Sequence, residues 1–121
     1  MKGPIWGIEE APAAQVADGL RRVRRCLAEG WAPWFPRDRD GRMAEATGED
    51  ACAWPILDAI ALFLPDVAAR LVAEELVDQA IGGSACVSEW EGAPGRTRGE
   101  VLAVVDRAVV RAMACARGER C

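Results

Sequence analysis

The sequence predicts an all-α protein: a compact orthogonal or irregular bundle of four main helices, with a long loop rich in tryptophan and proline between the first two. Apolar residues recur every three or four positions in four segments, which is the period of a helix with one buried face. No segment shows the strict alternation of a half-buried strand. The 121 residues, 51% of them hydrophobic, suffice for one core. We expect a single domain over residues 1–121, with flexible ends at 1–10 and 118–121.

The first predicted helix ends at Gly30, a residue that commonly stops helices, and Pro12 suits its first turn. Its buried stripe follows spacings of four, three and four residues and consists of Val16, Leu20, Val23 and Leu27. Gly19 lies inside this helix, where it costs about 1 kcal/mol relative to alanine. The packing around Gly19 must therefore compensate.

The second and third helices are separated by Pro65. The second is expected to begin near Asp50 and to run to Leu64, with a start at Pro55 as the alternative. Asp66 is the predicted N-cap of the third helix, which Gly82-Gly83 ends. The residues predicted to face inward on the third helix are Val67, Ala68, Leu71, Val72, Leu76 and Ala80. Those predicted to face solvent are Arg70, Glu74, Glu75, Asp78 and Gln79.

The fourth helix is predicted from about Arg98 to Arg117. Thr97 and Glu100 have the spacing of a capping box, in which each side chain accepts a hydrogen bond from the other residue's backbone N–H. The expected buried face consists of Val101, Leu102, Val105, Ala108, Val109 and Ala112. Trp90, just before this helix, is expected to anchor an irregular loop to the body of the protein.

The segment around Trp90 also resembles a family of small helical proteins from actinobacteria and phages that is catalogued only as a domain of unknown function. Its members are similar in carrying Trp-Asn-Asp-x-Pro-Gly-Arg-Thr before the last helix. The matching positions are Trp90, Pro94, Gly95, Arg96, Thr97, Glu100 and Val101. Glu91 and Gly92 replace the Asn-Asp pair, and Pro55-Ile56 stands where Gly-Ala is expected. The resemblance spans residues 13–117 and implies a helical fold, but it implies no activity and no catalytic residue.

Charge changes sign along the chain. Residues 21–42 hold seven arginines against three acids, residues 45–91 hold ten acids against one arginine, and residues 92–121 hold six arginines against three acids. We expect the basic first and last helices to pair with the acidic middle helices across the bundle. The alternative is that one of these charged surfaces binds a partner. Nucleic acid is not an expected partner because the net charge is −4.

Few residues suited to catalysis are present. The chain has no histidine, which removes the commonest general base and metal ligand, and we expect no catalytic residue, metal site or cofactor. Its five cysteines are widely spaced and are expected to be reduced thiols. Glu74 and Asp78 lie one helical turn apart, which leaves an enzyme that uses carboxylates or a thiol as the weakest alternative.

The tryptophans supply the candidate binding residues. Trp6, Trp31, Trp34 and Trp90 are all predicted outside helices. Indoles in loops either staple those loops to the core or form interfaces. The densest group runs from Trp31 to Pro36, and the candidate binding residues are Trp31, Trp34, Phe35, Trp90 and Arg96. Arg96 is expected to brace the Trp90 loop by hydrogen-bonding to carbonyl groups.

The sequence thus favours a small cytoplasmic interaction or regulatory protein, phage-associated and without catalytic activity. The longest apolar stretch, Ala51 to Pro65, contains Asp58 and is too short to span a membrane, and no signal peptide is visible. A protein partner is expected, and a homodimer through the Trp31–Phe35 patch is a further possibility. The alternative function is a small-molecule-binding module with a cleft lined by tryptophan.

Overall fold

The computed structural model describes residues 10–83 and 85–119, and these ranges contain helices and no sheet. The helices are α1 (Glu10–Glu29), α2 (Ile56–Phe63), α3 (Val67–Ile81), α4 (Val87–Glu91) and α5 (Arg98–Ala116). The predicted all-α class is confirmed, with one short helix added to the expected four. The expectations for the chain ends and for Trp6 fall largely outside the described residues.

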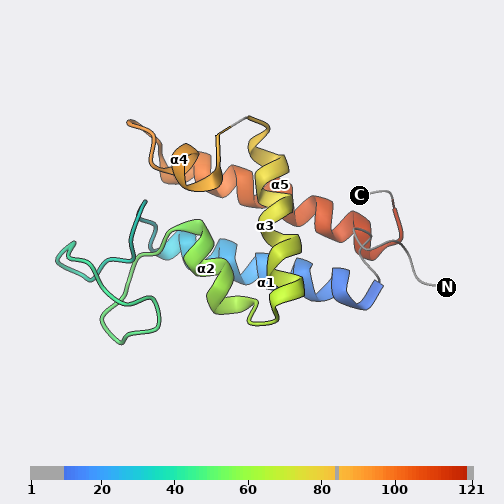
Figure 1. The fold of residues 1–121 in the computed structure, drawn as a ribbon, viewed down its shortest axis with the longest axis horizontal. Helices are drawn as coiled ribbons and strands as arrows, with labels where there is room; N and C mark the ends of the chain where they lie inside the picture. The colour runs from blue at the N-terminus through green and yellow to red at the C-terminus, as the bar shows by residue number, and fades with distance from the viewer. Residues whose placement is uncertain (1–9, 84, 120–121) are drawn as a thin grey trace.

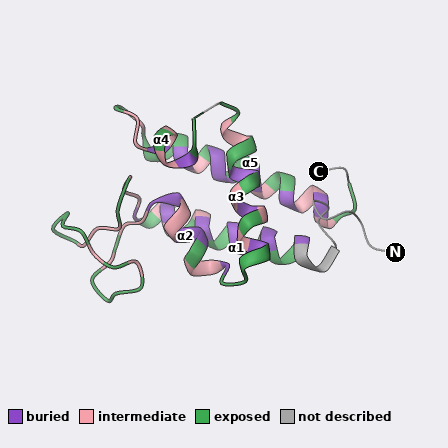
Figure 2. Cartoon of the chain, in the orientation of Figure 1, coloured by how far each residue is buried: buried purple, intermediate pink, exposed green. Residues whose placement is uncertain are grey.

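The bundle is built on α1 and α5, which run antiparallel side by side, with α3 crossing them (Figure 1). α1 packs most extensively against α5, and α3 packs chiefly against α5 and α1. Figure 2 shows buried residues concentrated where these helices face one another. The four residues predicted for the inner stripe of α1, from Val16 to Leu27, are all fully buried. None of the described helices combines the length and apolar character needed to cross a membrane.

Gly19 permits a close approach between α1 and the end of α2. A Cβ atom at this position would lie 2.5 Å from Cδ2 of Leu64, which is itself buried. Any larger side chain would therefore push α2 away from α1. This contact compensates for the low helix propensity of glycine.

The second helix begins later than the first of the two predicted starts. Asp50 is not its N-cap; Pro55 is, and the helix runs from Ile56 to Phe63. Proline fixes φ near the helical value and lacks an N–H, so it suits the start of a helix. The residues before it are extended because Trp54 and Ala53 form isolated bridges with Trp31 and Arg37.

The ends of α3 match the prediction, whereas its buried face matches only in part: Leu76 is buried as predicted, Val72 and Ala80 are partly buried against the core, and Ala68 is exposed. The Asp66 side chain accepts a hydrogen bond from the Ala69 N–H, and Gly82 ends the helix in the left-handed conformation. The buried residues of α3 are Ala69, Ala73, Leu76 and Val77. Val67 and Leu71, which were predicted to face inward, are 55% and 59% exposed. Two small alanines, Ala69 and Ala73, thus share the inner face with Leu76 and Val77, while Val67 and Leu71 point outward.

Trp90 lies in α4, a five-residue helix at a position where an irregular loop was predicted, so that prediction is wrong for residues 87–91. The next helix, α5, begins as predicted at Thr97, with both hydrogen bonds of the capping box formed by Glu100. Its buried residues are Val101, Val104, Val105, Ala108, Ala112 and Cys115. Leu102 and Val109 are only partly buried, at the edge of the core.

Residues 30–55 form an irregular excursion at one end of the bundle (Figure 1) that backbone hydrogen bonds hold to itself. The Trp54 N–H donates to the Gly30 carbonyl at 3.1 Å, and the Cys52 N–H donates to the Arg37 carbonyl at 2.8 Å. A Cβ atom at Gly30 would overlap the carbonyl oxygen of Cys52. The return of the loop to the end of α1 therefore requires glycine at position 30.

Replacing Gly30 with alanine should destabilise the protein by about 2 kcal/mol or more, because a backbone atom, not a flexible side chain, blocks the new methyl group. Gly99→Ala is the matched control. Its Cβ would meet only the Thr97 hydroxyl at 3.8 Å, in ordinary contact, and alanine favours the helix by about 0.5–1 kcal/mol. Thermal or denaturant unfolding measures the stability of both variants. Equal stabilities would contradict this account of Gly30.

Candidate functional site

The carboxylate of Glu91, the last residue of α4, lies at the point where three segments meet. Its Oε2 atom accepts a hydrogen bond from the indole Nε1 of Trp31 at 2.7 Å and from the backbone N–H of Ile56 at 2.8 Å. Glu91 is only 1% exposed, and it is the one buried charged residue in the part of the chain that the structure describes. A single oxygen therefore joins α4 to the loop after α1 and to the start of α2.

Glu91 also accepts a hydrogen bond at the N-terminus of α2, where a capping side chain normally does so. The N-cap residue, Pro55, makes no side-chain capping hydrogen bond. A helix N-terminus has unsatisfied N–H groups and a partial positive charge, which normally attract a carboxylate or hydroxyl oxygen from the capping residue. Here the oxygen comes from α4, 35 residues further along the chain.

The environment of Glu91 favours the protonated form. Burial raises the pKa of Glu91 from 4.5 to about 7, and the carboxylate of Asp58 also raises it. The hydrogen bonds from Trp31 and Ile56 lower the pKa, but their effect is smaller than that of burial. The side chain consequently changes charge near neutral pH.

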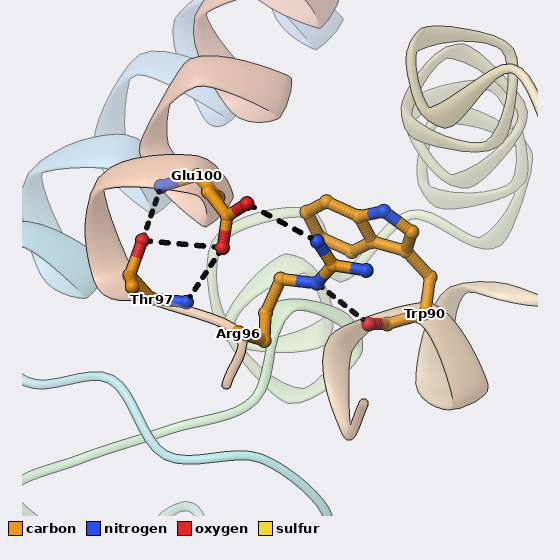
Figure 3. A network of polar contacts seen from close by, with 4 residues as sticks. All are labelled: Trp90, Arg96, Thr97 and Glu100. Atoms are coloured by element: carbon orange, nitrogen blue, oxygen red, sulfur yellow. Dashed lines mark hydrogen bonds and ion pairs between the residues drawn. The ribbon is translucent and has the colours of Figure 1, made fainter. Parts of the chain in front are cut away.

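A second cluster holds the chain between α4 and α5 (Figure 3). Arg96 Nε donates to the Trp90 carbonyl at 2.8 Å, and the guanidinium carbon lies 4.0 Å from the centre of the Trp90 ring. The same guanidinium contacts Glu100, a capping-box residue, at 3.4 Å. The predicted role of Arg96, bracing the Trp90 loop through a carbonyl, is confirmed.

Trp34 and Phe35 have a different setting from the other aromatic residues. They are 52% and 46% exposed, and we call this pair the aromatic surface. Trp34 has φ of 72°, which non-glycine residues rarely adopt. Its ring covers Gly92, where any Cβ atom would overlap the indole. Arg37 lies over the Phe35 ring, with its guanidinium carbon 5.7 Å from the ring centre.

The structure therefore divides the predicted binding residues into two groups. Trp31, Trp90 and Arg96 hold the loops to the core, as does Trp54, whose Nε1 donates to the Ala46 carbonyl at 2.9 Å. Trp34 and Phe35 alone among the predicted binding residues are exposed. Glu91 was not predicted as a site residue. In the sequence, only its position between a tryptophan and a glycine distinguishes it from the other acidic residues.

Two hollows lie along residues 38–52, and neither is lined by a tryptophan. One is lined by Cys52 and Arg39 together with four carboxylates, Asp38, Asp40, Glu49 and Asp50. Reactive thiols lie in electropositive surroundings, whereas acids dominate this hollow. Glu74 and Asp78 line neither hollow. No group of residues suited to a metal ion occurs within the described ranges.

The thiols do not all match the expectation from the sequence. Cys26, Cys52 and Cys86 are free, whereas Cys115 is disulfide-bonded, so the prediction of reduced thiols is wrong for Cys115. Cys121 lies outside the described residues. Burial, with a smaller contribution from Glu29, raises the pKa of the Cys26 thiol.

The charged helices do not pair as predicted. Among the described residues, the ion pairs on α1 and α5 are Arg22–Asp18 within α1 and Arg24–Asp106 between α1 and α5. The remaining pairs lie close in sequence near the two ends of α5. No ion pair in the described ranges joins the basic helices to the acidic α2 or α3.

These features define a small all-α protein in which a buried carboxylate joins a tryptophan-rich loop to two helices. Residues 11–111 match a family of unknown function, DUF6197, and the chain belongs to that family. No curated protein and no solved structure matches the chain. The family assignment agrees with the resemblance noted from the sequence and supplies no activity.

Replacing Glu91 with glutamine should remove a pH dependence of stability. Between pH 4.5 and 7 the unfolded chain has lost the Glu91 proton while the folded protein retains it, so wild-type stability falls as pH rises through this window. At about 1.4 kcal/mol per pKa unit, the loss is on the order of 3 kcal/mol. Glutamine can still accept both hydrogen bonds but does not titrate. Chemical denaturation at several pH values measures the slope, which Glu89→Gln, on the same helix, should leave unchanged.

Replacing Arg96 with alanine should lower the free energy of unfolding by about 2 kcal/mol, because a hydrogen bond from a charged donor and a cation–π contact are lost together. Lysine should restore only part of this loss, since its single ammonium group cannot donate to the carbonyl and also lay a planar group on the indole, as the guanidinium does. Arg39→Ala, at an exposed loop position, is the control. Equal free energies of unfolding for Arg96→Ala and Arg39→Ala would refute the bracing role of Arg96.

Proposed function

We propose that the protein is a small cytoplasmic interaction or regulatory protein, phage-associated and without catalytic activity, which binds a protein partner through the aromatic surface formed by Trp34 and Phe35. The observation that carries this proposal is the exposure of Trp34 in an unfavourable backbone conformation. Backbone strain of this kind costs about 1–3 kcal/mol and is concentrated at functional sites. The association with phages rests only on the resemblance of the Trp90 segment.

The residues around Trp34 and Phe35 support a binding surface and not an active site. The Trp34 ring lies over Gly92, which directly follows the buried Glu91, so the surface packs against the end of α4. A rigid, half-exposed tryptophan loses little entropy on binding, and tryptophan is enriched among residues that dominate interface energies. Phe35 and the stacked Arg37 extend the surface.

The chemistry of the surface suits a partner that offers an apolar pocket next to a negative charge. An apolar pocket on the partner would receive the Trp34 indole, and an acidic side chain beside that pocket would approach the Arg37 guanidinium. Such an arrangement combines apolar burial with a charge-assisted hydrogen bond.

The test uses the double variant Trp34→Ala/Phe35→Ala as affinity bait in an extract of the source cells, beside the wild type and Met43→Ala. Met43 is 63% exposed and controls for the loss of any exposed apolar side chain. We expect specific proteins that the wild type and the Met43 variant retain and the double variant loses, with a loss of affinity of at least about tenfold for the purified partner.

Unchanged melting temperature in the double variant would show that the loss of binding is not a loss of fold. Retention of the same proteins by all three baits would contradict the proposal. So would an enzymatic activity of the pure protein that survives removal of both aromatic rings.

A further inference from the structure

The outward face of α3 is apolar at one end and acidic at the other. Its members lie on one side of the helix and are Val67, Leu71, Glu74, Glu75 and Asp78. We call them the acidic face of α3. Val67 and Leu71 are each more than half exposed, and α3 crosses in front of α1 and α5 in Figure 1, where no other helix covers it.

The three carboxylates of this face have no ion-pair partner in the described part of the chain. Glu75 accepts a hydrogen bond from the neutral side chain of Gln79 at 3.2 Å, and the ion pairs of the described residues lie elsewhere. Arg70 lies one helical turn before Glu74 but forms no ion pair with it in the described ranges. Carboxylates without an ion-pair partner beside exposed aliphatic residues form a surface suited to a partner that presents both apolar groups and positive charge.

The same chain presents a surface of that kind on α5. Val110 is 64% exposed, and Arg107, about one turn before it, and Arg111, directly after it, are exposed as well. We call these three residues the basic face of α5. Arg107 donates to the Ala80 carbonyl at the end of α3 but pairs with no acid in the described ranges, and neither does Arg111. The two faces therefore both combine exposed aliphatic side chains with charge, which is negative on α3 and positive on α5.

From this complementarity we propose that the chain self-associates, with the acidic face of α3 docked on the basic face of α5 of a second copy. Leu71 would contact Val110 of the other chain, while Glu74 and Glu75 approach its arginines. Pairing α3 with α3 would place like charges together, which costs binding energy. The proposal is independent of the aromatic surface, but an assembly of two copies would present two aromatic surfaces and so bind a multivalent partner more tightly.

The test measures mass in solution by sedimentation velocity over a range of protein concentrations. Two variants reverse the charge of one face each: Glu74→Arg/Glu75→Arg and Arg107→Glu/Arg111→Glu. Each variant alone should be shifted towards monomer, with a dissociation constant raised at least about tenfold. An equimolar mixture of the two should recover association, because every contact in a mixed assembly again joins opposite charges.

Glu45→Arg/Glu49→Arg is the control, since it makes the same change in net charge on exposed loop residues and should associate like the wild type. Leu71→Asp tests the apolar part of the contact and should also give monomer. Circular dichroism verifies that each variant is folded. Wild-type protein that is monomeric at every concentration would overturn the proposal, as would association that the reversals leave unchanged or a mixture of folded variants that fails to associate.

Discussion

The hydrogen bonds of one buried carboxylate, that of Glu91, fix the positions of the segments that carry the aromatic surface. Trp31 and Ile56 are separated by the whole irregular excursion of residues 30–55, and both donate to the same oxygen. A buried carboxylate is costly unless hydrogen bonds satisfy it. The burial of Glu91 therefore makes this arrangement of the three segments specific, because losing either contact would leave a buried polar group with one hydrogen bond fewer.

The tryptophans have two distinct roles as a result. Trp31, Trp54 and Trp90 each use a polar group, an indole N–H or a backbone carbonyl, to bind one part of the chain to another. Trp34 lies only three residues after Trp31, yet half of its surface faces solvent. Trp34 thus combines an unfavourable backbone conformation with solvent exposure, in a region whose other tryptophans are held by hydrogen bonds.

Much of the fold could be predicted from local signals, because caps and periodicity depend on neighbouring residues. The stripe of α1, the N-cap at Asp66 and the capping box at Thr97 are examples. Only part of the inner face of α3 could be predicted in this way. Leu76 is buried as its hydrophobicity indicates, whereas Leu71 is exposed although hydrophobicity alone favours its burial over that of Ala69 and Ala73. Glu91 was missed for a similar reason: its partners come from distant segments, so no sequence spacing reveals them.

The most direct test of this account is an NMR titration of the Trp31 indole N–H, which donates to Glu91. Its chemical shift should change with a midpoint near pH 7, the raised pKa of the carboxyl group, and Glu91→Gln should abolish the transition while the other indole signals keep their positions. A Trp31 signal that does not titrate, or that titrates near pH 4.5 like an exposed glutamate, would show that this carboxylate is not buried between the three segments.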